Sequence, residues 1–135
     1  MERRKGTETI LIVDDEEMIK DLARDILARY GYTVLTAGGG EEAVEVFRQH
    51  HKEIAVVVLD IMLPDVGGRE VFRRIREIDP AARVIISSGY SQERDANELL
   101  KEGALKFVQK PYRINSLVGA VGEVLEKKEN EKLGR

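Results

Sequence analysis

Several short apolar runs in this sequence end in a residue with an acidic, hydroxyl or amine side chain. These residues are Asp14, Asp15, Asp60, Ser88 and Lys110. Three carboxylates brought together repel one another and raise one another's pKa unless a cation lies between them. A cluster of oxygen ligands without histidine or cysteine suits Mg²⁺ or Mn²⁺. A metal ion and a lysine beside an aspartate form a site for a phosphoryl group, with the carboxylate as nucleophile.

Asp60 occupies the most informative of these positions. It ends the run IAVVVLD at residues 54–60, which contains three successive valines. Such a run is typical of a strand buried on both faces of a parallel sheet. Pro64 and the pair Gly67-Gly68 then turn the chain. Asp60 is therefore predicted at the carboxyl end of a central strand, where open α/β sheets bind ligands. A carboxylate there is costly to bury unless a cation meets it.

The elements that position these residues alternate regularly along the chain. Strands are predicted over residues 9–13, 32–37, 54–60, 83–87 and 105–108. Helices are predicted over residues 16–30, 41–49, 68–77 and 92–101, and from residue 114 to 126 or beyond. This order predicts an α/β fold, a doubly wound (βα)5 domain with a parallel five-stranded sheet and helices on both faces. The carboxyl ends of parallel strands lie on one edge of the sheet, so the polar residues should meet there.

Local patterns add detail to three of these helices. In the first, an apolar stripe is predicted to face the core, and it comprises Met18, Ile19, Leu22, Ala23, Ile26, Leu27 and Tyr30. Ser91 is the candidate N-cap of the helix at residues 92–101. In the last helix Gly119 and Gly122 are each expected to cost roughly 1 kcal/mol relative to alanine.

The composition excludes several classes of protein. The chain has 135 residues, a formal net charge of -3 and no cysteine, so neither a disulfide framework nor a thiolate metal site is available. That charge gives no general attraction to nucleic acid or to an anionic membrane. The longest apolar runs are far too short to span a bilayer, and no signal peptide is recognisable. We expect one cytoplasmic domain over residues 9–127, with tails at residues 1–8 and 128–135.

Four segments around the polar residues resemble the receiver domain of two-component response regulators. They are ILIVDDE at residues 10–16, LDIMLPDVGG at 59–68, VIISSGYS at 84–91 and GALKFVQKPY at 103–112. The match runs from about residue 9 to residue 125. Four motifs in the right order are far more specific than any one of them. The resemblance implies a flavodoxin-like receiver fold with strand order 2-1-3-4-5, acting as a signalling phosphoacceptor and not as an enzyme.

The resemblance assigns roles to the acidic residues. Asp60 would be the phosphoacceptor, taking its phosphoryl group from a phosphohistidine on a sensor histidine kinase or a histidine phosphotransfer protein. Asp15 and Asp60 would bind Mg²⁺ (or Mn²⁺) together with the backbone carbonyl of Met62. Asp14 would act mainly through a metal-bound water. The domain's partners would thus be proteins, with no direct contact to nucleic acid or membrane.

The resemblance also assigns the phosphoryl-binding and switch residues. Ser88 and Lys110 would each bind a phosphoryl oxygen, and Lys110-Pro111 would be a cis peptide, which X-Pro bonds adopt at low cost. Phe107 would be the switch aromatic that turns inward once the Ser88 hydroxyl moves to the phosphate. Since the family more often has tyrosine there, Phe107 would signal by packing alone.

Other residues are expected to flank the phosphoryl group. Met62 and Tyr90 lie two positions past Asp60 and Ser88, and we hypothesise that they slow the attack of water on an aspartyl phosphate. Gly89 and Pro111 adjoin the two phosphoryl-binding residues.

Two other functions remain open from the sequence. A magnesium-dependent phosphohydrolase with an aspartate nucleophile would need a second acid two residues on, where this chain has Met62. A pseudo-receiver that is never phosphorylated usually loses one of the acids or the lysine, and this chain keeps all of them. The sequence leaves open whether the domain stands alone or belongs to a larger protein such as a hybrid histidine kinase. It also leaves open whether phosphorylation makes it dimerise.

Two further motifs are assigned no chemistry. His50-His51 follows a predicted helix, so its rings would point in different directions and are expected to be solvated. Gly38-Gly39-Gly40 lacks the lysine and hydroxyl residue of a P-loop, and we interpret it as a turn.

Overall fold

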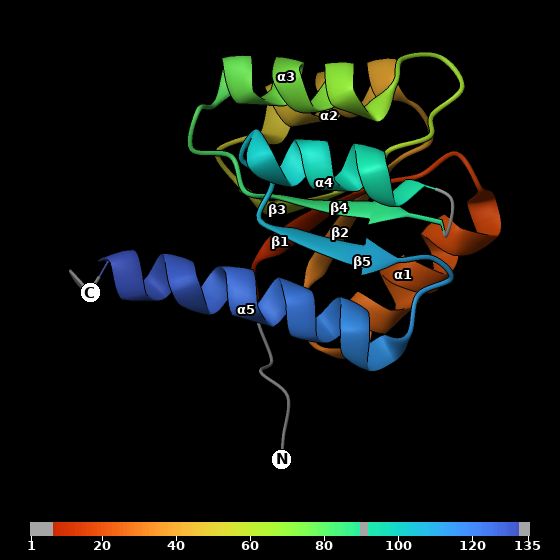
Figure 1. Ribbon diagram of the computed structural model, residues 1–135. Helices are drawn as coiled ribbons and strands as arrows, with labels where there is room; N and C mark the ends of the chain where they lie inside the picture. The colour runs from red at the N-terminus through yellow and green to blue at the C-terminus, as the bar shows by residue number, and fades with distance from the viewer. Residues whose placement is uncertain (1–6, 90–91, 133–135) are drawn as a thin grey trace.

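A five-stranded parallel sheet in the order β2-β1-β3-β4-β5 forms the centre of the structure (Figure 1). Its strands are β1 (Thr9–Val13), β2 (Thr33–Ala37), β3 (Ile54–Asp60), β4 (Val84–Ser88) and β5 (Lys106–Gln109). The computed structural model describes residues 7–89 and 92–132. The predicted fold class and strand order are confirmed.

Five helices cover the two faces of this sheet. They are α1 (Glu17–Arg29), α2 (Gly40–His50), α3 (Gly68–Ile78), α4 (Glu93–Lys101) and α5 (Ile114–Lys132). Helices α1 and α5 pack on one face, and α2, α3 and α4 pack on the other (Figure 1). Every predicted strand and helix is present. Helix α5 continues to Lys132, into the segment that we expected to be a tail. The candidate N-cap Ser91 lies outside the described residues.

Strand β3 is buried on both sides, as its apolar run predicts. Val57 and Leu59 belong to the core under α2, α3 and α4, whereas Val56 and Val58 belong to the core under α1 and α5. Successive side chains of a strand point to opposite faces, so two cores require apolar residues at every position. The run therefore ends only where the strand reaches the sheet edge, at Asp60.

The predicted buried stripe of α1 is partly wrong. Met18 is 85% exposed and Leu22 is 41% exposed, while Ala23, Ile26 and Leu27 are buried. A step of four residues in an α-helix overshoots one full turn by about 40°. Residues spaced four apart therefore drift around the helix, and the side facing the sheet does not include Met18 and Leu22, whereas Ile19 packs against the core.

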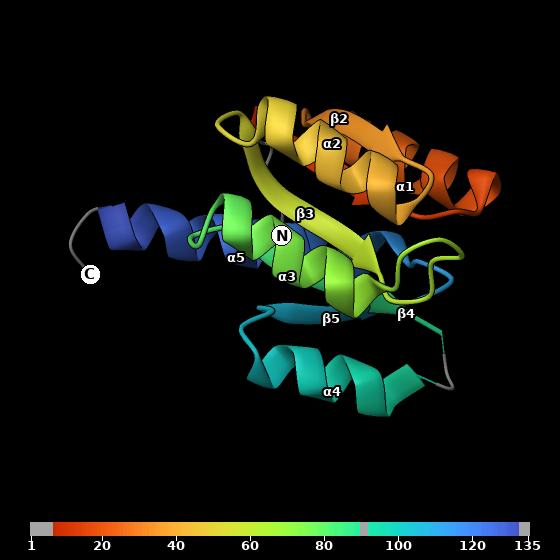
Figure 2. The ribbon, with the colours of Figure 1, turned by 90° about the horizontal axis from the view of Figure 1, so that it is seen from above.

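The carboxyl ends of the strands point to one edge of the sheet. The arrowheads of β4 and β5 in Figure 1 and of β2 and β3 in Figure 2 point the same way. The loops that follow β1, β3 and β5 therefore leave the sheet at the same edge. Among the helices of the described residues, none is long and apolar enough to cross a membrane.

Candidate functional site

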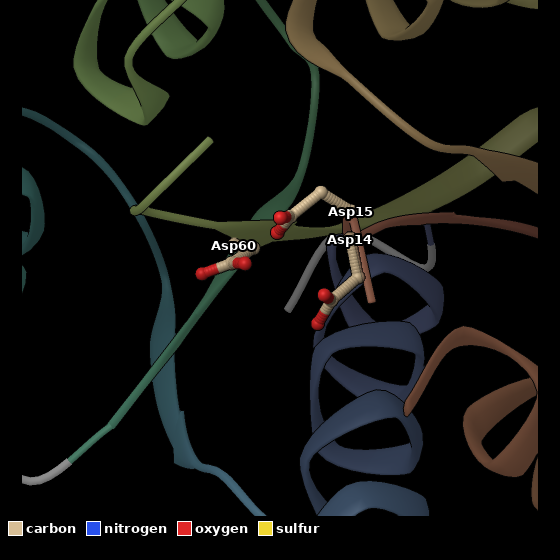
Figure 3. A group of neighbouring side chains, drawn as sticks. All are labelled: Asp14, Asp15 and Asp60. Carbon is tan, nitrogen blue, oxygen red and sulfur yellow. The ribbon is translucent and has the colours of Figure 1, made fainter. Parts of the chain in front are cut away.

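Three carboxylates lie together at the ends of β1 and β3 (Figure 3). One oxygen of each of Asp14, Asp15 and Asp60 lies within 4.8 Å of the others. Asp14 and Asp60 are 0% and 1% exposed, whereas Asp15 faces solvent. The strand ends thus bring two buried acids and one exposed acid to a single point, as the sequence predicts.

Local backbone contacts fix one oxygen of each buried acid. The Glu16 N–H donates to Asp14 Oδ1 at 2.9 Å, and the Met62 N–H donates to Asp60 Oδ1 at 3.1 Å. In both cases the donor lies two residues after the acid, the Asx-turn arrangement in which an aspartate turns the chain at the end of a strand. The second oxygen of each carboxylate remains directed at the shared site.

Lys110 supplies the cation that these buried acids require. Its Nζ lies 2.9 Å from Asp14 Oδ2 and 3.0 Å from Asp60 Oδ2, and 3.5 Å from Glu16 Oε1. Burial lowers the pKa of Lys110, but hydrogen bonds to the Asp14 and Asp60 carboxylates outweigh it and hold the pKa above its ordinary value. The lysine is therefore charged at neutral pH. The Lys110-Pro111 peptide is cis, as expected.

The electrostatics of Asp60 differ from those of an ordinary surface aspartate. The pKa of Asp60 is raised to about 6, because burial and repulsion from Asp14 together outweigh the Lys110 hydrogen bond, which acts in the opposite direction. One lysine therefore compensates two buried carboxylates only in part. A hard divalent cation, whose preferred ligands are oxygens, fits the three carboxylates and would complete that compensation.

Ser88 places a hydroxyl group at the same edge. It is the last residue of β4 and is 0% exposed. Its backbone carbonyl accepts the Lys110 N–H at 2.8 Å, whereas its Oγ makes no hydrogen bond within the described part of the chain. A buried hydroxyl group without a partner is uncommon, because such a group loses its hydrogen bonds to water. Its position beside the site makes it available to a ligand.

The residues predicted to flank the site differ in exposure. Met62 is 59% exposed, Gly89 is half-buried and Pro111 is exposed. Tyr90 lies outside the described residues. Phe107 is half-buried on β5, packs against the core under α4, and lines a groove with Ala96 and Leu100 of that helix.

A second buried polar contact beside the site was missed from the sequence. Ser87 Oγ and the Tyr112 hydroxyl lie 2.7 Å apart, and both residues are buried. This contact links the end of β4 to the loop that carries Lys110. Burial raises the pKa of the Tyr112 hydroxyl above its ordinary range. The available signal was Ser87 itself, a polar residue next to the end of an otherwise apolar strand.

The two histidines were expected to be solvated, and both are half-buried at the end of α2. His50 Nδ1 is 3.7 Å from Glu53 Oε2, and His51 Nδ1 is 3.1 Å from the Arg48 carbonyl oxygen. Their contacts are local to the end of α2.

The doubly wound fold, the acidic edge and Lys110 together form a site that suits a phosphoryl group. A family model described as the response regulator receiver domain matches residues 10–122. The chain belongs to this receiver-domain family. Members of the family act as phosphoacceptors and interact with histidine kinases or phosphotransfer proteins.

Curated relatives and solved structures agree with this assignment. The chain is 34% identical over 116 residues to the chemotaxis protein CheY of Thermotoga maritima, covering 85% of this chain and 95% of that protein. It is 32% identical over 124 residues to the sensor kinase CckA of Brucella abortus, covering 92% of this chain but only 13% of that kinase. A receiver domain protein from Clostridium thermocellum superposes with a TM-score of 0.86 at 31% identity, covering 90% and 97% of the two chains.

A further solved structure is a CheX–CheY–BeF3–Mg²⁺ complex from Borrelia burgdorferi. It matches with a TM-score of 0.83 at 33% identity and covers 87% of this chain and 89% of that chain. The relatives therefore include both separate receiver proteins and a receiver-like part of a much longer kinase.

Proposed function

We propose that Asp60 is the phosphoacceptor of this receiver domain. The observation that carries the proposal is a buried carboxylate at the carboxyl end of the central strand, 3.0 Å from Lys110 Nζ and within 4.8 Å of two further carboxylates. The donor is a phosphohistidine on a sensor histidine kinase or a histidine phosphotransfer protein. We place this reaction in the cytoplasm.

The reaction is a single phosphoryl transfer. An Asp60 carboxylate oxygen attacks phosphorus and forms the O–P bond while the P–N bond to the donor imidazole breaks. The electron pair of that bond stays with the imidazole nitrogen, which takes up a proton. When bound, Mg²⁺ neutralises charge on the phosphoryl oxygens and on the acids. We assign its binding to Asp14, Asp15, Asp60 and the backbone carbonyl of Met62.

Lys110 and Ser88 act on the transferred group. Lys110 already contacts Asp60 and stabilises the negative charge that arrives on the phosphoryl oxygens. The Ser88 hydroxyl, unpartnered within the described residues, donates to another phosphoryl oxygen. Both side chains thus interact more strongly with the phosphorylated state than with the unphosphorylated one.

The switch follows from that difference. Movement of the Ser88 hydroxyl toward the phosphate frees space that Phe107 fills, and the packing between β5 and α4 changes. Because Phe107 lines a groove with Ala96 and Leu100, its movement alters the surface over α4 and β5. The output would be that surface together with α5, and a dimer formed on phosphorylation would use α4 and α5.

Intact mass after incubation with acetyl phosphate tests the proposal, with and without Mg²⁺ and with Asp60→Asn beside the wild type. We expect the wild type to gain one phosphoryl group only with Mg²⁺, and the variant to gain none. This small donor also shows whether the domain phosphorylates itself. Light scattering on the same samples measures dimer formation.

Two results would contradict the proposal. No gain of mass from acetyl phosphate or from a phosphorylated histidine phosphotransfer protein, in a chain that also binds no Mg²⁺, would make it a pseudo-receiver; a chain that binds Mg²⁺ would instead be a donor-selective receiver. Multiple turnovers on small phosphate esters would make it a phosphohydrolase.

A further inference from the structure

The loop between β3 and α3 is attached to the start of α2 through one side chain. Asp65 Oδ1 accepts the Gly40 N–H at 2.8 Å, and Asp65 Oδ2 accepts the Glu41 N–H at 3.0 Å. The first N–H groups of a helix have no partner within the helix. Asp65 therefore caps α2 from a loop 25 residues further along the chain. Figure 2 shows this loop beside the start of α2.

The glycine turn before α2 allows that approach. A Cβ atom on Gly40 would lie 2.8 Å from Val66 Cβ, from the Val66 carbonyl oxygen and from Val71 Cγ2. A Cβ atom on Gly39 would lie 3.2 Å from both carboxylate oxygens of Asp65. Any larger residue at position 40 would push the loop away from the helix. The Gly38-Gly39-Gly40 motif lacks the signature of a phosphate-binding loop, and it packs instead against the β3–α3 loop.

The other end of the loop is closed at its base. The Gly68 N–H donates to the Ile61 carbonyl oxygen at 2.9 Å. A Cβ atom on Gly68 would lie 2.6 Å from Ile61 Cα, so the two backbones touch directly. The loop is thus fixed at residues 61 and 68 by the backbone and at its outer end by Asp65. Met62, whose carbonyl we assign to the metal, lies between these fixed points.

We propose that Asp65 is a positioning residue for Mg²⁺ binding, because its two hydrogen bonds to the start of α2 hold the loop that carries the Met62 carbonyl. The inference rests on the proposed function, since it requires that Mg²⁺ bind beside Asp60. Within the described residues no hydrogen bond or ion pair joins Asp65 to the acids or to Lys110, so it acts through the backbone of its loop. Residues that orient metal ligands from outside the first coordination shell commonly change metal affinity by 10–100-fold when they are replaced.

The Asp65 carboxylate that caps α2 is negatively charged at neutral pH. The N–H groups of Glu41 and Gly40 hold the pKa of the Asp65 carboxyl at about 2. Asp65→Ala removes both acceptors. Asp65→Asn keeps one acceptor oxygen but loses the charge that favours a helix N-terminus. The two variants therefore form a graded series at one position.

Asp79→Ala is the matched control. Asp79 Oδ1 also accepts a backbone N–H, that of Ala81, at 2.9 Å. It follows the C-terminus of α3, at the opposite edge of the sheet from the acids. This control removes a comparable backbone contact without touching the phosphoacceptor loop.

The experiment measures three quantities on the full chain. They are the Mg²⁺ dissociation constant by calorimetry, the rate of phosphorylation by acetyl phosphate against Mg²⁺ concentration, and the melting temperature. We expect Asp65→Ala to raise the dissociation constant roughly tenfold, with Asp65→Asn between it and the wild type. At saturating Mg²⁺ the maximal rate should return to within about twofold of the wild type, because the transition-state contacts of Asp60 and Lys110 are intact. Asp79→Ala should leave the Mg²⁺ dissociation constant and the maximal rate unchanged.

Several outcomes would overturn the inference. One is a Mg²⁺ dissociation constant for Asp65→Asn equal to that of the wild type while amide exchange at Gly40 and Glu41 is faster. Another is a phosphorylation rate of Asp65→Ala that stays below that of the wild type even at saturating Mg²⁺. Such a result would indicate that a smaller fraction of the variant is folded, and not that a metal ligand is displaced. A wild-type chain that binds no Mg²⁺ would overturn the proposed function, and this inference with it. If the wild type is phosphorylated normally and Asp65→Ala has the same Mg²⁺ dissociation constant, the inference is rejected while the proposed function stands.

Discussion

At the scale of single residues, the site holds more buried negative charge than its one lysine compensates. Asp60 and Asp14 are both buried, and one lysine serves them both. Ser88 adds a buried hydroxyl group that has no partner in the described part of the chain. The raised pKa of Asp60 and the unpartnered Ser88 hydroxyl lower the stability of the unphosphorylated, metal-free state. A bound cation or phosphoryl group would relieve both, so the features that destabilise the free domain would favour these ligands.

We therefore expect Asp60→Asn to stabilise the metal-free protein at pH 7.5 by roughly 1–2 kcal/mol. The pKa of Asp60 is raised from 3.8 to about 6, so the folded state binds a proton that the unfolded state does not bind between these values. The contribution of Asp60 to stability therefore falls as pH rises through that range. The gain is reduced because asparagine has one acceptor oxygen where aspartate has two. Denaturant unfolding with EDTA measures it.

The pH dependence provides the control for this variant. Below pH 6 the wild-type carboxyl becomes protonated, so the difference in unfolding free energy between wild type and Asp60→Asn should shrink toward pH 5. A difference that stays constant from pH 5 to pH 8 would show that Asp60 ionisation does not contribute to it.

At the scale of elements, glycines have opposite roles in α2 and α5. Gly122 lies within α5, and a Cβ atom there would meet nothing within 4 Å outside the helix's own backbone. Gly40 begins α2, where a Cβ atom would overlap the β3–α3 loop. One glycine therefore only weakens its helix, and the other permits a contact between two elements.

The variants Gly122→Ala and Gly40→Ala should accordingly change stability in opposite directions. We expect Gly122→Ala to raise the free energy of unfolding by up to about 1 kcal/mol through helix propensity. We expect Gly40→Ala to lower it by roughly 1–3 kcal/mol through overpacking. Urea unfolding of the two single variants measures both effects. A loss of stability in Gly122→Ala would mean that α5 packs more closely around this position than the structure shows.

At the scale of the whole molecule, the sheet joins distant parts of the chain at one edge. Asp14 and Lys110 are 96 residues apart in sequence and form a 2.9 Å contact. Because β1, β3 and β5 each contribute a site residue, the site exists only when the whole sheet is formed. Binding at this edge is thereby coupled to global folding.

Mg²⁺ should therefore stabilise the entire fold. At a concentration of 100 times its dissociation constant, we expect the free energy of unfolding to rise by about 2.7 kcal/mol. Thermal unfolding against Mg²⁺ concentration measures this linkage, and the dissociation constant obtained should agree with calorimetry. An equal stabilisation of an Asp15→Asn/Asp60→Asn double variant would place the bound ion elsewhere on the molecule.

The local sequence determined the elements and the edge where chemistry could occur. Apolar runs such as residues 54–59 predict strands, and amphipathic spacing predicts helices. This works because the buried positions of a helix and of a strand recur at different intervals along the sequence. Since all strands are parallel, a polar residue that ends a strand is placed at the shared edge without knowledge of packing. This is why Asp14, Asp60, Ser88 and Lys110 could be predicted to meet.

Tertiary structure alone decided which groups touch. The side of α1 that faces the sheet, the contact between Ser87 and Tyr112, and the capping of α2 by Asp65 were not predicted. Each depends on how separately formed elements pack together, and no local period carries that information. A spacing of four residues does not fix which side of a helix is buried. An exposed loop aspartate does not reveal, from its neighbours in sequence, that it meets the first N–H groups of another helix.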